Sequence, residues 1–77
     1  MPKKAYILIE SQPGLSSQLV NDLENIKEVT AVDFVSGPYD FIAEIEVDEV
    51  DDIGSLITQA VHPIHGIDRT VTCISIE

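Results

Sequence analysis

Cysteine, tryptophan and basic residues are almost missing from this chain. Its 77 residues include one cysteine, no tryptophan and only four lysines and arginines. A single cysteine, Cys73, excludes an intrachain disulfide framework and any zinc site built from several cysteines. A domain of this size buries only about 60% of the surface that its unfolded chain exposes. We therefore expect self-association to supply the stability that disulfides or a structural metal give other small domains.

The scarcity of basic residues also excludes whole classes of partner. Fourteen aspartates and glutamates give a formal net charge of −10 at pH 7. Phosphate groups are bound by clustered lysines and arginines, and the only basic pair in this chain is Lys3-Lys4. We therefore expect no direct binding to nucleic acid or to a membrane. No signal peptide and no run of about twenty apolar residues is present, which favours a cytoplasmic protein.

The apolar residues, 44% of the chain, follow two kinds of periodicity. Short runs rich in β-branched and aromatic residues predict strands at 5–10, 29–36, 40–47 and 67–76. Apolar residues spaced three or four apart predict one helix after the first strand and another after the third. The apolar stripes of these helices are Leu15, Leu19, Leu23 and Ile26, and Ile53, Leu56, Ile57, Ala60, Val61 and Ile64.

Local signals set the ends of these elements. A turn at Gly37 joins the second and third strands as a hairpin. Asp48 is the expected N-cap of the second helix, and Asp51 suits its positive N-terminus. Pro63 predicts the end of that helix. Gly54 within it predicts a close packing contact, because glycine otherwise costs about 1 kcal/mol relative to alanine.

This order of elements predicts an α+β fold of the ferredoxin-like type, βαββαβ. Its antiparallel sheet carries both helices on one face, with the first and third strands at the centre. The helices cover one face only, yet the strands place apolar residues on both faces. An uncovered apolar face of several hundred Å² is more than a monomer usually exposes. We expect two chains to pair sheet to sheet as a dimeric α+β barrel; the alternative is a monomer with an apolar surface.

Candidate catalytic and metal-binding groups are few. His62 and His65 have the spacing of a metal-binding pair, but Pro63 lies between them and a third ligand would have to be a recruited carboxylate. The acidic residues at 44–52 lack the glycine and ligand order of a calcium loop. Cys73 on an apolar strand is expected to be a small buried hydrophobe rather than a nucleophile. We therefore expect no catalytic residue, no metal, no cofactor and no enzyme activity.

Two segments resemble the effector-binding (RAM) domain of the Lrp/AsnC, or feast/famine, transcriptional regulators. Residues 29–41, VTAVDFVSGPYDF, are similar to the family pattern V…(T/S)-G-x-(Y/F)-D that leads into the third strand. Residues 65–74, HGIDRTVTCI, are similar to the pattern G-(V/I)-x-x-T-x-T that leads into the fourth. The matching residues are Gly37, Tyr39, Asp40, Gly66, Ile67, Thr70 and Thr72.

The resemblance implies a single RAM domain over residues 1–77, without the helix-turn-helix DNA-binding domain of full-length regulators. It also implies dimers that assemble further into tetramers, octamers or rings. Family members bind small effectors, commonly amino acids, between dimers. Carried over to this chain, the implied ligand-binding residues are Gly37, Pro38, Tyr39, Asp40, Thr70, Thr72 and Ile74.

Each residue of the Gly37–Asp40 turn receives a role from the resemblance. Gly37 offers a backbone amide, Tyr39 a wall or a hydroxyl, and Asp40 an acceptor for an α-ammonium group. Pro38 removes one N–H from the turn, which alters effector preference. The implied function is a regulatory module that binds an amino acid or a similar small metabolite. Its further implied partners are full-length Lrp/AsnC regulators, so that it modulates transcription or amino-acid metabolism.

Two other functions remain as alternatives. Dimeric α+β barrels of this shape also serve as small monooxygenases and isomerases, which usually place a histidine, asparagine or tryptophan in the barrel cleft. This chain has no tryptophan, and both of its histidines lie near the end of the second predicted helix. The other alternative is a purely structural oligomerisation module with an empty interface.

Overall fold

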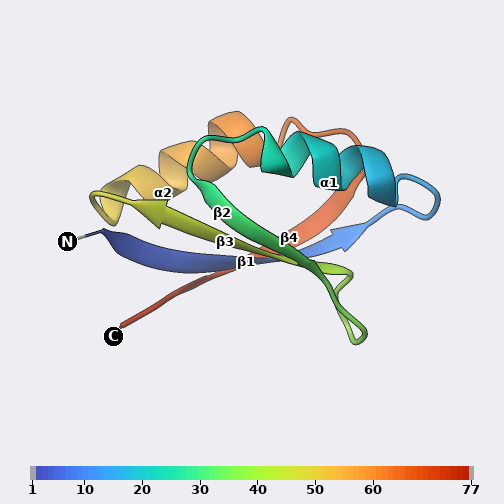
Figure 1. The fold of residues 1–77 in the computed structure, drawn as a ribbon, viewed down its shortest axis with the longest axis horizontal. Helices are drawn as coiled ribbons and strands as arrows, with labels where there is room; N and C mark the ends of the chain where they lie inside the picture. Colours follow the sequence, from blue (N-terminus) through green and yellow to red (C-terminus); the bar gives the residue numbers. More distant parts are fainter. Residues whose placement is uncertain (1, 77) are drawn as a thin grey trace.

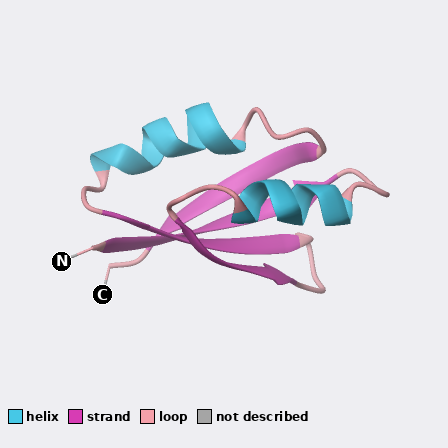
Figure 2. Cartoon of the chain, turned by 45° about the horizontal axis from the view of Figure 1, so that its top comes forward, coloured by secondary structure: helices cyan, strands magenta, loops and turns pink. Residues whose placement is uncertain are grey.

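The computed structural model describes residues 2–76 as a sheet with two helical segments on one face (Figures 1 and 2). The predicted βαββαβ fold of the α+β class is confirmed. The elements are β1 (Lys3–Ser11), α1 (Ser16–Glu24), β2 (Val29–Phe34), β3 (Phe41–Val47), α2 (Asp51–Leu56), the π-helical turn η1 (Ile57–Val61) and β4 (Ile67–Ile74).

The four strands form one antiparallel sheet in the order β2-β3-β1-β4. The two central strands are therefore β1 and β3, as predicted. Ile9 of β1 lies opposite Phe41 of β3 on one side and Thr70 of β4 on the other. The start of β3, the end of β1 and the start of β4 consequently meet at one end of the sheet, and the β1–β4 register shifts there, between Glu10 and Ser11.

The hydrophobic core lies between the helices and the sheet. Alternate residues of β1 and β3 face the helices, as the burial of every second residue at 5–9 and 41–47 shows. Burying one such side chain contributes about 1.5–3 kcal/mol. The residues that are 9% exposed or less are Ala5, Ile7, Ile9, Leu19, Leu23, Phe41, Ala43, Ile45, Val47, Ile53, Ile57 and Val61. No helix among residues 2–76 is long and apolar enough to cross a membrane.

The N-terminus of α2 differs from the prediction. Its N-cap is Val50, no side chain makes a capping hydrogen bond, and the prediction of Asp48 as the cap is wrong. The Asp52 N–H donates to Glu49 C=O and the Ile53 N–H to Val50 C=O, both at 3.0 Å. Because these turns already satisfy the amides, no side-chain acceptor is needed. Asp51 and Asp52 do occupy the first turn, where the helix dipole favours them.

The middle and the end of this helical segment also differ in detail. A Cβ added at Gly54 would find no atom within 4 Å, so the predicted close packing there is wrong. Gly54 lies on the exposed side of α2, away from the sheet. The helix ends at Val61, two residues before Pro63, as predicted. Its last turn is π-helical, with the His62 N–H donating to Ile57 C=O at 2.8 Å.

Candidate functional site

Asp40 joins the β2–β3 connection to the end of β1. Its carboxylate oxygen Oδ2 accepts a hydrogen bond from the Ser11 backbone N–H at 2.8 Å and another from Ser11 Oγ at 3.2 Å. The Asp40 backbone N–H donates to Ile9 C=O at 2.8 Å, and its C=O accepts from the Val35 N–H at 2.9 Å. Within residues 2–76, Ser11 is the only donor to this carboxylate, which leaves Oδ1 able to accept from a ligand.

Tyr39 and Arg69 meet at the same end of the sheet, although they come from opposite sides of β1. The guanidinium carbon of Arg69 lies 5.4 Å from the centroid of the Tyr39 ring, which is a cation–π distance. Nη2 of Arg69 lies 3.8 Å from Oε2 of Glu10, its neighbour across the β1–β4 pair. The three side chains therefore form a charged cluster beside Asp40.

The remaining predicted ligand-binding residues are spread along the chain. Gly37 and Pro38 are exposed in the connection that projects beyond the sheet (Figure 1). Thr70, Thr72 and Ile74 follow one another along the helix-side face of β4, opposite Ile9, Ile7 and Ala5. Ile74 therefore lies about 13 Å along the strand from Thr70, at 3.3 Å per residue. The structure brings Tyr39, Asp40 and Thr70 to one end of the sheet and leaves Ile74 toward the other.

A small cavity of about 290 Å³ lies at the start of β4. It is lined by His62, Ile67, Asp68, Arg69 and Thr70. Thr70 Oγ1 lies 3.4 Å from Nε2 of His62, within reach of a long hydrogen bond whose direction depends on the histidine tautomer. The cavity lies at the same end of the sheet as the charged cluster, but Thr70 faces the helices whereas Arg69 faces the opposite side.

The sequence patterns predict no role for Arg69, Glu10 or Ser11. Arg69 nevertheless carries a signal that sequence alone contains, because it is the only arginine in a chain with a formal charge of −10. Ser11 carries no such signal, since its bond to Asp40 joins residues 29 positions apart. Such a contact depends on the strand register, which sequence periodicity does not fix.

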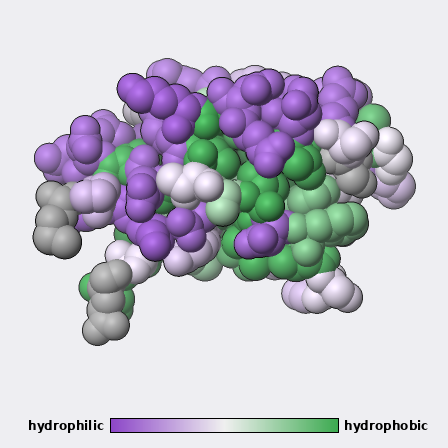
Figure 3. All heavy atoms as spheres, in the orientation of Figure 1, coloured by the Kyte–Doolittle hydropathy of each residue, from purple (hydrophilic) through white to green (hydrophobic). Residues whose placement is uncertain are grey.

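The face of the sheet opposite the helices has an apolar centre. Leu8 lies between Ile42 and Val71, and Tyr6 lies opposite Cys73. We call these five residues the apolar patch. Figure 3 shows hydrophilic residues over the helices and hydrophobic residues gathered below them, over the strands.

The apolar patch differs from the sequence predictions in two ways: in the exposure of Cys73 and in the charged residues at its edges. Cys73 is exposed, so the prediction that it is buried is wrong for a single chain, because it lies on the face that the helices do not cover. The uncovered face is also less uniformly apolar than predicted. Charged residues flank the patch, with Lys4 and Glu44 3.9 Å apart on one side and Glu10 and Arg69 on the other.

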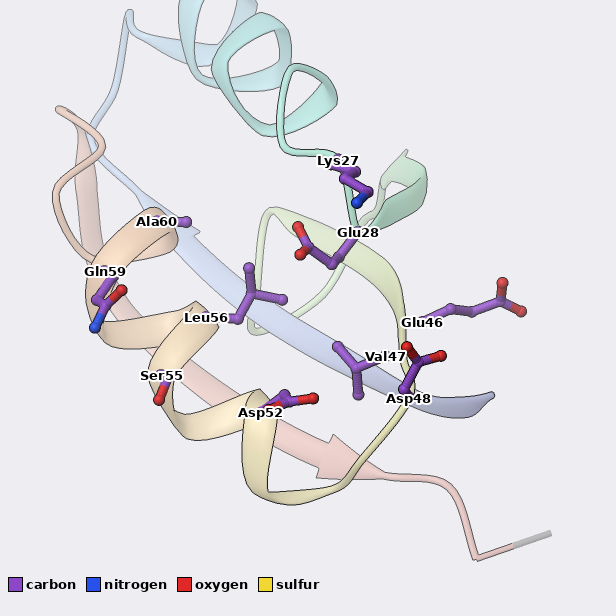
Figure 4. A pocket seen from close by; sticks show the side chains of 10 residues that line it. All are labelled: Lys27, Glu28, Glu46, Val47, Asp48, Asp52, Ser55, Leu56, Gln59 and Ala60. Carbon is purple, nitrogen blue, oxygen red and sulfur yellow. The ribbon is translucent and has the colours of Figure 1, made fainter. Parts of the chain in front are cut away.

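A larger cleft of about 650 Å³ lies between α2 and the opposite end of the sheet (Figure 4). Val47 and Leu56 contribute apolar side chains to it, and Lys27 is its one cationic residue. Four carboxylates, from Glu28, Glu46, Asp48 and Asp52, make the cleft repel anions. None of the predicted ligand-binding residues lines it. Over residues 2–76 no group of three or more His, Cys, Asp or Glu is arranged to hold a metal ion.

Curated relatives of this chain include an uncharacterized HTH-type transcriptional regulator, PH0140, of Pyrococcus horikoshii. It is 27% identical over 70 residues, which are 91% of this chain and 44% of that protein. The chain spans about half the length of the curated relatives it matches.

Solved structures share the fold over nearly the whole chain. FFRP-DM1 is 30% identical with a TM-score of 0.90, and the match covers 96% of this chain and 99% of that one. The transcriptional regulator NMB0573 of Neisseria meningitidis, solved as a complex with L-methionine, has a TM-score of 0.89 at 10% identity. That match covers 97% of this chain and 50% of the regulator, and it shows likeness of fold alone.

The match to a family model is as extensive. Residues 4–77 match the model of the Lrp/AsnC ligand binding domain. This range includes both segments that resemble the family in sequence and all the strands of the sheet except the first residue of β1. The chain therefore belongs to the Lrp/AsnC ligand-binding domain family.

Proposed function

We propose that this chain is an effector-binding regulatory module that takes an amino acid or a similar small metabolite at an interface between chains. The family is regulatory, and its members bind small effectors such as amino acids and form oligomers. The observation that supports the proposal is that Tyr39, Asp40 and Thr70 lie at the same end of the sheet, with Thr70 on the side that faces the helices. These are residues to which the family resemblance assigns effector binding.

We propose that Asp40 has two separate tasks, which the geometry of its carboxylate supports. Oδ2 fastens the connection to Ser11, and Oδ1 remains to accept a hydrogen bond from an α-ammonium group. Such charge-assisted bonds are about twice as strong as neutral ones. Tyr39 forms a wall beside this acceptor, and Gly37 and Pro38 extend from it into solvent.

A single chain leaves this site open, which supports a site completed by a second chain. The turn at Gly37–Asp40 projects beyond the sheet, while Thr72 and Ile74 lie further along β4. In one chain these groups do not surround a common cavity. We propose that assembly brings the turn of one copy against β4 of another, so that all seven predicted ligand-binding residues contribute.

The apolar patch supports the assembly itself. We propose that two copies pair through this face into a dimeric α+β barrel and that dimers assemble further. Residues 4–77 match the family model of the ligand-binding domain. We propose that this domain regulates transcription by associating with full-length Lrp/AsnC regulators, and not by binding nucleic acid or by catalysis.

A thermal-shift screen against the twenty common amino acids at millimolar concentration tests the proposal. An amino acid at about 100 times its dissociation constant stabilises the native state by roughly 2.7 kcal/mol, so its binding raises the melting temperature. We expect one amino acid, or a few related ones, to do so. A flat panel would contradict amino-acid sensing.

Asp40→Asn tests the site within the same screen. The asparagine oxygen still accepts a hydrogen bond from the Ser11 N–H, but the negative charge that attracts an ammonium group is gone. We expect the shift to disappear in Asp40→Asn and to persist in Asp48→Asn. The control removes the same charge at the opposite end of the sheet. Equal shifts in all three proteins would place the site elsewhere.

A further inference from the structure

We propose that Arg69 recognises the carboxylate of the effector and that Tyr39 positions its guanidinium group. The inference rests on the proposed function and adds to it the chemical class of the ligand. That class is a small carboxylic acid, either an amino acid or its 2-oxo acid. Arg69 was given no role by the sequence patterns, so the structure alone assigns this one.

The negative charge of the chain makes a nearby positive group favourable for binding a carboxylate. A carboxylate approaching a protein with a formal charge of −10 is repelled unless a local positive group offsets that field. Within residues 2–76 the cationic side chains are Lys3, Lys4, Lys27 and Arg69. Lys3 and Lys4 begin β1 at the opposite end of the sheet, and Lys27 lines the larger cleft there. Arg69 is the one lysine or arginine at the end where Tyr39 and Asp40 meet.

The neighbours of Arg69 hold its guanidinium in place without using its hydrogen-bond donors. The centroid of the Tyr39 ring lies 5.4 Å from the guanidinium carbon. A cation–π contact of this kind uses the face of the ring and leaves the N–H donors of the guanidinium unused. The Glu10 contact of 3.8 Å is an ion pair longer than a hydrogen bond. Among the described residues, no group lies within hydrogen-bond distance of the Arg69 guanidinium.

An arginine held in this way suits a carboxylate. Its planar fork forms two parallel N–H···O bonds to one carboxylate, which gives both strength and a defined direction. The Arg69 side chain is 62% exposed, so a ligand reaches it from solvent. Arg69 and Thr70 also line the same 290 Å³ cavity, although their side chains lie on opposite faces of β4.

Glu10 is expected to affect binding of an acid in the opposite direction to Arg69. Its carboxylate is the anion that now lies beside Arg69, so it competes with a carboxylate ligand and repels it. Removing this charge is expected to strengthen binding of an acid. A merely structural ion pair between Arg69 and Glu10 predicts no such gain.

Calorimetric titration of the full chain tests the inference. The probes are L-methionine and any other amino acid that raises the melting temperature in the screen, each with its carboxamide and its 2-oxo acid. We expect the carboxamide to bind about tenfold or more weakly than the acid, because a charge-assisted hydrogen bond is lost. Binding of the 2-oxo acid would support carboxylate recognition and assign the ligand to both acids. Its failure to bind, with the amino acid bound, would support the amino acid as the effector.

Substitutions test which side chains produce the preference for the acid over its carboxamide. Arg69→Gln is expected to weaken the acid about tenfold and to leave the carboxamide unchanged, whereas Glu10→Gln tightens the acid. Lys27→Gln, which removes the same charge at the far cleft, is the matched control and leaves both probes unchanged. Tyr39→Phe is expected to keep the preference for the acid, and Tyr39→Leu to reduce it, which separates positioning by the ring from direct contact.

The possible failures are distinguishable. Amino acids that bind Arg69→Gln and wild type equally, or carboxamides that bind as well as the acids, overturn the role of Arg69 and leave the proposed function standing. A wild type that binds no amino acid and no 2-oxo acid overturns both. Loss of oligomer mass in Arg69→Gln, measured by light scattering, would overturn the inference by assigning Arg69 to assembly.

Discussion

Gly66 shows how one residue fixes the loop before β4. Its φ of +101° lies in a region that side chains rarely adopt, and the residue is buried. A Cβ added here would lie 3.2 Å from Leu15 Cβ and 3.1 Å from Leu15 Cδ1. The Gly66 C=O accepts a hydrogen bond from the Gln12 N–H at 2.7 Å. This glycine of the family motif therefore holds the start of β4 against the start of α1, beside the candidate site.

We expect Gly66→Ala to destabilise the fold by about 1–3 kcal/mol, because it adds backbone strain and displaces Leu15. Urea unfolding measures the change as a lower midpoint with an unchanged slope. Gly14→Ala is the matched control, since Gly14 has a φ of +85° but a Cβ there would meet no atom within 4 Å. Equal losses in the two variants would show that packing against Leu15 contributes nothing.

At this scale the sequence predicts candidate residues but not the side chains that they contact. The family resemblance predicts Tyr39 and Asp40 as site residues, and these neighbours in sequence lie at one end of the sheet. It did not predict that Ser11 takes one Asp40 oxygen or that Arg69 lies over Tyr39. These contacts join three strands, so they exist only once register and strand order are set. A linear pattern of residue types contains no such information.

The elements themselves follow from periodicity, because burial demands it. In a strand that packs on one face, every second residue faces the core, and residues 5–9 of β1 and all of β3 have that pattern. Their ends are less predictable, since local hydrogen bonds decide them. β2 ends at Phe34 and β4 at Ile74, each two residues before the predicted end. The π-helical turn η1 left no sequence signal, because one added residue in a turn changes the apolar spacing very little.

The α2 helix offers a test of its own stability through Gly54. Because no neighbour contacts this position, alanine is expected to raise the free energy of unfolding by about 0.5–1 kcal/mol through helix propensity. Thermal unfolding followed by circular dichroism measures it. A loss of stability in Gly54→Ala would mean that another chain packs against this side of α2, since the single chain leaves it open.

The whole molecule has one helical layer for two sheet faces. Residues of the first face fill the core, whereas the apolar patch of the second is covered by nothing in the single chain. Leu8, Tyr6 and Ile42 are already partly shielded by their neighbours, and Val71 remains 39% exposed. A second copy pairing through this face would bury them all. Its flanking charges would then lie at the rim, where solvent still reaches them.

Leu8→Glu tests this pairing at the centre of the patch. A carboxylate between Ile42 and Val71 would be buried without a partner on assembly, which is strongly unfavourable, whereas in the single chain it faces solvent. We therefore expect the wild type to have the mass of a dimer or a larger oligomer by light scattering. Leu8→Glu is expected to shift toward the monomer mass while its circular dichroism spectrum stays that of a folded protein.

The matched control for Leu8→Glu is Gln18→Glu. It adds the same single charge on the exposed surface of α1, away from the sheet. This variant is expected to keep the mass of the wild type, which separates burial of a charge from the effect of a more negative chain. A monomeric wild type, or a Leu8→Glu protein with unchanged mass, would rule out pairing through the apolar patch. The effector site would then have to be closed by contacts of the Gly37–Asp40 turn alone, because no sheet-to-sheet dimer would exist to build on.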